Sequence, residues 1–150
     1  MAASDIAYAI IGGGVIGRAV ARSLQERCTG EIVVIERCPK GLVENQSTRN
    51  SGVIHAGLYY KKATRPNKAR LCVAGNKMLY EFCEKHQVRH ARTGKLIVAT
   101  DEREESFLPD LLANARDNAV PGVRLLSASE VSLLEPRIVA KAALLVPSSG

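Results

Sequence analysis

Residues 6–17 of the chain are IAYAIIGGGVIG, an apolar run of six residues that leads directly into a glycine cluster. The apolar run, 6–11, is typical of a strand buried on both faces of a parallel sheet. Apolar residues at helical spacing follow over 14–27, and a second buried strand is expected over 31–36. A strand, a glycine turn, a helix and a strand within about thirty residues predict a βαβ unit. The chain is therefore expected to open as half of a Rossmann fold.

The glycine cluster matches GxGxxG at Gly12, Gly14 and Gly17. In this motif the first glycine permits a tight turn, the second lets the backbone approach a diphosphate, and the third brings helix and strand close together. Glu36 ends the second expected strand, where an acid commonly accepts the ribose hydroxyls of a dinucleotide. It would repel a 2′-phosphate, which argues against NADP. The alternative interpretation is a plain tight turn, with Glu36 as a surface charge.

The segment 47–60, STRNSGVIHAGLYY, follows the second expected strand and is crowded with hydrogen-bonding side chains, glycines and a histidine. The glycine motif and the acid are shared by NAD-binding and FAD-binding proteins. Because an NAD-binding domain has no evident need for such a loop, the segment favours FAD. The alternative is a well-capped surface turn in which His55 is a structural histidine.

Further helices and strands are expected downstream. A helix over 66–85 carries apolar residues at helical spacing and is expected to pack on a core through Leu71, Ala74, Gly75, Met78, Leu79, Phe82 and Cys83. Strands are expected over 94–100 and 142–146. Asp101 with Glu104 and Ser127 with Glu130 are capping-box patterns, which predict one helix to about residue 118 and a short one ending before residue 136. We expect an incomplete nucleotide-binding domain over 1–90 and the beginning of an α+β substrate domain over 91–150.

The composition suits an ordinary globular domain: 150 residues, 46% hydrophobic and 24% charged. No apolar run approaches the roughly 20 residues that cross a bilayer, and the start lacks the features of a signal or transit peptide. The cytoplasm is therefore the expected compartment, with peripheral membrane association left open. The net charge of +6 is scattered and aromatic residues are few, which disfavours nucleic acid as a partner. The four cysteines form no CxxC pair, so no metal site is expected.

Several stretches, taken together and in order, resemble one family of proteins. They are GGGVIG at 12–17 with the acid at 36, NSGVIHAGLYY at 50–60, KARLCVAGNKMLYEFC at 68–83, TGKLIVAT at 93–100, VPGVRLL at 120–126 and EP at 135–136. They resemble the FAD-dependent L-2-hydroxyglutarate dehydrogenase/oxidase family, within the larger D-amino-acid-oxidase-like (DAO) group of flavoproteins. The related glycerol-3-phosphate dehydrogenase and amine oxidase branches resemble residues 68–136 less closely.

The resemblance implies that FAD is the cofactor and that a small 2-hydroxy acid is the substrate, L-2-hydroxyglutarate being oxidised to 2-oxoglutarate. A base would take the hydroxyl proton while a hydride passes to the flavin. His55 is the candidate catalytic base, because it is the only histidine in the loop expected to face the flavin. The candidate cofactor-binding residues are Gly12, Gly14, Val15, Ile16, Gly17, Glu36, Arg37, Ser47, Asn50, Ser51, Gly52 and Val53.

Family members run to several hundred residues, so the chain is expected to be an N-terminal fragment. Three alternatives stay open at this point. One is another DAO-type enzyme, acting on glycerol 3-phosphate, an amine or an amino acid. Another is an inactive nucleotide-binding fragment, and the third is an NAD-dependent dehydrogenase. The electron acceptor, a quinone or oxygen, is left open as well.

Overall fold

The computed structural model describes residues 5–38 and 46–150. The chain divides into two compact units, Met1–Gly52 and Val53–Gly150, and each is described by itself. The expected boundary at residue 90 concerns domains of a longer protein and differs from this division at residue 52. That boundary stays a prediction.

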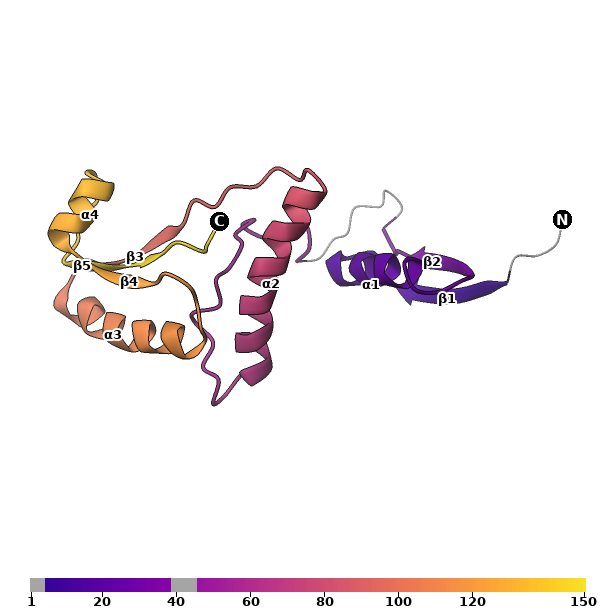
Figure 1. Cartoon of the computed structure of the whole chain (residues 1–150), viewed down its shortest axis with the longest axis horizontal. Helices are drawn as coiled ribbons and strands as arrows, with labels where there is room; N and C mark the ends of the chain where they lie inside the picture. Colours follow the sequence, from indigo (N-terminus) through magenta and orange to yellow (C-terminus); the bar gives the residue numbers. More distant parts are fainter. Residues whose placement is uncertain (1–4, 39–45) are drawn as a thin grey trace. The chain divides into compact units, whose positions relative to one another are not determined.

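The first unit is a βαβ unit, as the sequence predicts (Figure 1). It consists of β1 (Ile6–Ile11), α1 (Val15–Gln25) and β2 (Glu31–Ile35). The two strands are parallel, with Ile11 paired to Ile35 at their carboxyl ends. The backbone N–H of Gly12 continues the pairing by donating to the carbonyl of Ile35 at 2.8 Å. The glycine cluster and the end of β2 therefore lie at the same edge of the sheet.

Burial in the first unit differs from the expectation that β1 is covered on both faces. Gly13 is the only buried residue within the described part of this unit, and Ile11 is 79% exposed. A two-stranded sheet with a single helix has too few elements to cover both of its faces. The prediction of a doubly buried strand is therefore wrong for the residues described.

The second unit is built around an antiparallel sheet in the order β3-β5-β4. Its elements are α2 (Pro66–Lys85), β3 (Lys95–Ala99), α3 (Glu102–Asp117), β4 (Arg124–Ser127), α4 (Ala128–Leu134) and β5 (Ala142–Val146). β4 was not expected from the sequence, because it has four residues and runs directly into the capped start of α4. The other elements lie within two residues of the predicted bounds.

Helices cover both faces of this sheet (Figure 1). On one face, Leu144 and Val146 pack with α3 residues such as Leu112. On the other face, Ala143 packs with Val131 of α4. The core beneath α3 also contains Ala56 and Leu58, which belong to no helix or strand. The loop that precedes α2 is thereby built into the core.

Helix α2 packs through a narrower face than the sequence predicts. Ala69, Tyr80 and Cys83 are buried. The apolar stripe predicted from the sequence consists of the seven residues of this helix that were expected to pack on a core. Four of them, Leu71, Met78, Leu79 and Phe82, have 42–65% of their surface exposed. The expectation that this whole stripe packs on a core is wrong for the described residues, because the loop of residues 55–57 contacts α2 beside the stripe, at Cys72, Val73 and Asn76.

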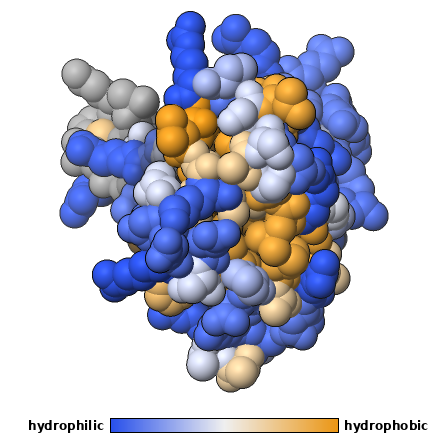
Figure 2. Space-filling model, turned by 90° about the vertical axis from the view of Figure 1, so that its left-hand side faces the viewer, coloured by the Kyte–Doolittle hydropathy of each residue, from blue (hydrophilic) through white to orange (hydrophobic). Residues whose placement is uncertain are grey.

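Apolar surface also remains around α4. Figure 2 faces the end of the molecule that carries α3 and α4 and shows apolar side chains gathered there. Leu133, Leu134 and Val139 are exposed by 52–90%. Within the described residues, no helix is long and apolar enough to cross a membrane, and no group of His, Cys, Asp and Glu side chains is arranged to hold a metal ion.

The predicted capping box is present at α4, and at α3 only the N-cap half of the predicted box is present. At α4 the Ser127 hydroxyl accepts the N–H of Glu130, and the Glu130 carboxylate accepts the N–H of Ser127. At α3 the Asp101 carboxylate accepts the N–H of Glu104 at 2.8 Å, while the Glu104 carboxylate accepts the N–H of Thr100. The other half of the box at α3 is therefore displaced by one residue. In each case, N–H groups at the start of a helix gain an acceptor.

Replacing Ser127 by alanine is expected to lower the free energy of unfolding by about 1 kcal/mol, because the first turn of α4 loses its cap. The measurement is urea denaturation of the chain. The matched control is Ser132→Ala, at an exposed position inside the same helix, where alanine favours the helix. Equal stability of the Ser127 variant and the control would contradict the role of the cap.

The Glu130 carboxyl is expected to titrate far below an ordinary glutamate. The N–H of Ser127, the Arg124 guanidinium and the Ser127 hydroxyl lower its pKa to about 2. A lowered folded-state pKa means that this stabilisation is complete above the ordinary glutamate value and is lost as the pH falls through about 2. Carbon NMR of the side chain measures the midpoint, which Arg124→Ala should raise. A midpoint near the ordinary value would refute the assignment.

Candidate functional site

The glycine turn of the first unit requires glycine at two positions, at one for its backbone conformation and at the other for lack of space. Gly12 adopts φ +102°, in the left-handed region that favours glycine. A Cβ atom at Gly17 would overlap the carbonyl oxygen of Gly12 and lie 3.2 Å from its carbonyl carbon. Helix α1 therefore begins in direct contact with the end of β1. This is the close approach that the spacing of the motif predicts.

The amino end of α1 is suited to an anion. Gly14 is the N-cap, no side chain caps the helix at this residue, and the first turn contains no acidic residue. The N–H of Val15 donates to the Ser47 hydroxyl at 2.9 Å, which places Ser47 beside the glycine turn. Val15 and Ile16 are exposed. The positive end of the helix dipole, with no acidic residue in the first turn, favours a phosphate group at this position.

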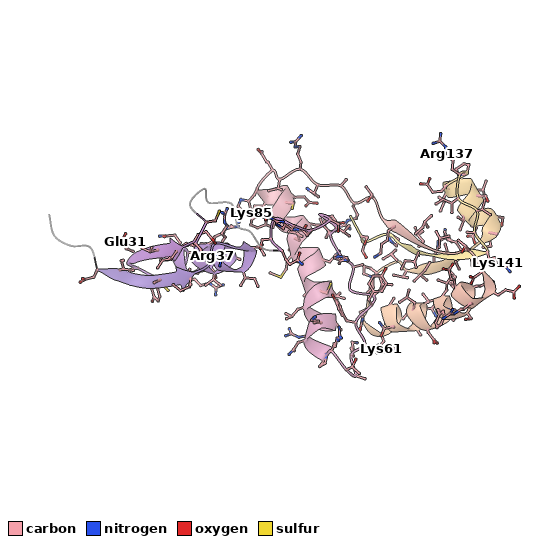
Figure 3. All side chains as sticks on the ribbon, turned by 180° about the vertical axis from the view of Figure 1, so that it is seen from behind. Glu31, Arg37, Lys61, Lys85, Arg137 and Lys141 are labelled. Carbon is pink, nitrogen blue, oxygen red and sulfur yellow. The ribbon has the colours of Figure 1, made fainter. Side chains whose placement is uncertain are left out.

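Glu36 lies directly beside the glycine turn. Its carboxylate accepts the N–H of Gly13 at 2.7 Å and the N–H of Cys38 at 3.0 Å. Both bonds lower the pKa of Glu36, and the bond from Cys38 has the larger effect. The side chain is therefore ionised at neutral pH. A carboxylate has about four lone-pair positions, which leaves capacity for ribose hydroxyls. Arg37 is exposed, at the opposite end of β2 from Glu31 (Figure 3).

Residues 46–52 are linked by hydrogen bonds of the Asn50 side chain. The Asn50 amide donates to the carbonyl of Gln46 at 2.8 Å, and its oxygen accepts the N–H of Gly52 at 2.9 Å. Gly52 has φ +72°. Ser51, Gly52 and Val53 are exposed. Their assignment to the cofactor stays a prediction.

His55 belongs to the second unit. The residue is exposed, and its carbonyl accepts the amide of Asn76 at 3.1 Å and the thiol of Cys72 at 3.8 Å. The structure therefore shows how the main chain of His55 is held. The assignment of its side chain as a base stays a prediction.

Sequence analysis missed three asparagines that hold the loop around His55. Asn76 lies in α2, Asn114 in α3, and Asn118 caps the end of α3. The Asn118 amide donates to the carbonyls of Gly57 at 2.9 Å and Tyr60 at 2.7 Å, and the Asn114 amide also reaches Tyr60, at 3.4 Å. An available signal was the occurrence of asparagine, a poor helix former, at helical positions near apolar neighbours.

Comparison with known sequences identifies close similarity to one group of enzymes. The chain is 41% identical over 143 residues to the mitochondrial L-2-hydroxyglutarate dehydrogenase of Arabidopsis thaliana and 37% identical over 147 residues to that of Homo sapiens. The enzyme of the same name from Dictyostelium discoideum is 40% identical over 131 residues. These matches cover 87–98% of this chain but 28–31% of the relatives. The chain thus spans less than a third of their length.

Solved structures of the same fold include flavoenzymes. The L-α-glycerophosphate oxidase of Mycoplasma pneumoniae, solved with FAD bound, matches 95% of this chain and 37% of its own, with a TM-score of 0.78 and 28% identity. The L-proline dehydrogenase of P. horikoshii matches with a TM-score of 0.77 at 21% identity, over 98% of this chain and 38% of its own, which shows the shared fold. The family model for FAD-dependent oxidoreductases matches residues 7–150. The chain belongs to this family, the DAO family of FAD-dependent oxidoreductases.

Proposed function

We propose that the protein containing this chain oxidises L-2-hydroxyglutarate to 2-oxoglutarate with FAD as its cofactor. The observation that carries this proposal is the 37–41% identity, along most of the chain, to relatives that bear the name L-2-hydroxyglutarate dehydrogenase. The family assignment supports FAD and argues against the NAD-dependent alternative. Because the chain spans less than a third of those relatives, residues outside it would supply the rest of the site.

The first unit fits the diphosphate and the adenosine ribose of FAD. Only a glycine fits at position 17, so α1 begins close against the end of β1, as the motif requires. The amino end of α1 provides a favourable dipole, and the first turn of the helix contains no acidic residue. The ionised carboxylate of Glu36, held at 2.7 Å from the N–H of Gly13, is placed to accept ribose hydroxyls.

The reaction requires removal of a hydroxyl proton and of the hydrogen on the adjacent carbon. Bound FAD supplies the acceptor for that hydrogen, which leaves as a hydride. In our proposal the imidazole of His55 takes the hydroxyl proton, and the exposed position of this residue supports access to a substrate. The substrate gains a carbonyl group and loses two electrons and two protons in total.

A second candidate substrate is glycerol 3-phosphate. The structural match to L-α-glycerophosphate oxidase, at 28% identity, favours it over the amine-oxidising branches, whose matched structures share 20–22%. Both candidates are small anionic molecules that carry an oxidisable hydroxyl group. An inactive fragment that only binds nucleotide is the remaining alternative for the chain taken alone.

We infer a small-molecule partner and keep both a quinone and oxygen as electron acceptors. The expectation of a cytoplasmic location has no support from the relatives, whose names say mitochondrial. No helix in the described residues can span a membrane. The cytoplasm therefore stays a prediction, and a mitochondrial location is the competing proposal.

Anaerobic addition of L-2-hydroxyglutarate to the whole protein is expected to bleach the oxidised-flavin absorption band, because the substrate's hydride reduces the flavin. The measurement is the visible spectrum before and after addition, with the D enantiomer as the control. If glycerol 3-phosphate bleaches the band and L-2-hydroxyglutarate does not, the substrate is the second candidate, glycerol 3-phosphate. A spectrum without a flavin band would contradict the assignment of FAD as the cofactor.

Gly17→Ala is expected to weaken FAD binding by about 10- to 100-fold, because relieving the overlap of the new Cβ with the Gly12 carbonyl costs on the order of 1–3 kcal/mol. The matched control is Gly75→Ala in α2, where an added Cβ has no neighbour within 4 Å. FAD content is measured by absorbance, and folding by circular dichroism. Full FAD content in a folded Gly17→Ala protein would refute the role of the turn.

A further inference from the structure

The main chain around His55 is held on both sides by hydrogen bonds within the second unit. The N–H of Gly150 donates to the carbonyl of Ile54 at 3.2 Å, and the N–H of Ile54 donates to the carbonyl of Gly150 at 2.7 Å. The next carbonyl, that of His55, accepts the Asn76 amide at 3.1 Å. The two peptide planes that flank the α-carbon of His55 are therefore both fixed.

Two fixed peptide planes determine a side chain's direction. Each peptide group is planar, so φ and ψ are the only soft backbone dihedrals at a residue. The Ile54–Gly150 pairing orients the plane before His55, and the Asn76 amide orients the plane after it. The direction of the Cα–Cβ bond of His55, and hence the region its imidazole can reach, follows from these bonds.

Asn76 also fixes the segment that pairs with Ile54. The same amide nitrogen donates to the carbonyl of Ser148 at 2.8 Å, and the buried Tyr80 hydroxyl donates to that carbonyl at 3.3 Å. One side-chain amide thus bridges two main-chain carbonyls, one in the His55 loop and one in the segment after β5. Loss of this amide would release both peptide groups together.

Packing prevents the loop from lifting away from α2. Gly57 has φ +92°, and a Cβ at this residue would lie 2.8 Å from Val73 Cγ2 and 3.2 Å from the backbone nitrogen of Val73. Leu58 is fully buried in the core beneath α3. The chain after His55 is therefore anchored, and the remaining freedom at His55 is rotation of the peptide plane that Asn76 holds.

The second donor to the His55 carbonyl is weaker. Burial raises the pKa of Cys72, which keeps the thiol protonated and able to donate. Its sulfur lies 3.8 Å from the carbonyl oxygen, against 3.1 Å for the Asn76 nitrogen. A thiol is also a poorer donor than an amide. Asn76 is therefore the principal side-chain donor to this peptide group.

We propose that Asn76 is a positioning residue that sets the orientation of the His55 imidazole toward the substrate. The proposal rests on the proposed function, in which His55 is the base. Asn76 would act through His55 alone, without touching substrate or cofactor. Its contribution would appear in the rate of flavin reduction and leave cofactor content unchanged.

The test uses Asn76→Asp in the whole protein. The aspartate has nearly the same size but offers an oxygen to two carbonyls in place of a donor. Anaerobic stopped-flow reduction of the flavin by L-2-hydroxyglutarate is expected to slow by about 10-fold or more, because displacement of a catalytic group costs rate, while KM and FAD content change less than twofold. Asn67→Asp, at an exposed position of the same helix, makes the same charge change and should reduce at the wild-type rate.

A double-mutant cycle separates positioning from general stability. His55→Gln should slow reduction, and adding Asn76→Asp to it should cause no further loss, because Asn76 acts through the removed imidazole. If Asn76→Asp does not fold, Asn76→Ala takes its place in the cycle, with a smaller expected loss. The proposal is overturned if the losses of the two single variants multiply in the double variant. It is also overturned if the folded Asn76 variants reduce flavin at the wild-type rate, or if His55→Gln keeps full activity.

The same experiment distinguishes failure of the proposed function. If the wild-type flavin is reduced by glycerol 3-phosphate and not by L-2-hydroxyglutarate, the substrate assignment fails. The cycle is then measured with glycerol 3-phosphate, and non-additivity between positions 55 and 76 still supports the positioning role. Additivity with either reducing substrate overturns it.

Discussion

The contact between Gly17 and the carbonyl of Gly12 is the constraint on which the first unit depends. Any side chain at position 17 would move the start of α1 away from the end of β1. At the observed distance, the turn places the N–H of Gly13 2.7 Å from the Glu36 carboxylate at the end of β2. One missing Cβ thus brings the helix dipole and an ionised acid to the same edge of the sheet.

The parts of the fold that the sequence predicted are those set by short-range chemistry. The spacing of Gly12, Gly14 and Gly17 determines a turn through steric limits that act within six residues. The N-cap at Asp101 and the capping box at Ser127 are local hydrogen-bond patterns, and each caps the helix that the sequence predicts there. Such signals need no knowledge of what packs against them, which is why they were predictable.

Burial and the supports of the His55 loop were not predictable in this way. Exposure of Ile11 and of the stripe on α2 depends on which elements cover them, and periodicity alone carries no such information. Asn76 contacts residue 148 across 72 positions of sequence, and Asn118 contacts Gly57 across 61. An asparagine at a helical position gives no indication of which distant carbonyl it will hold. The candidate site residues were predicted from residue type and spacing, without knowledge of their partners, which lie 23 positions away for Glu36 and 32 positions away for Ser47.

The two units use opposite kinds of hydrogen bond to satisfy the polar groups of backbone outside strands. In the first unit, main-chain N–H groups of Gly13, Val15 and Cys38 donate to a carboxylate and a hydroxyl. In the second, the carbonyls of the loop accept side-chain amides from α2 and α3. Loops without helix or strand usually leave their polar backbone groups to water and move. In the first unit the holding side chains are those of Glu36 and Ser47, and in the second they come from α2 and from Asn118 at the end of α3. In our proposal, these backbone groups are held by the protein itself, which lowers the entropy lost when a cofactor and a small substrate are brought together.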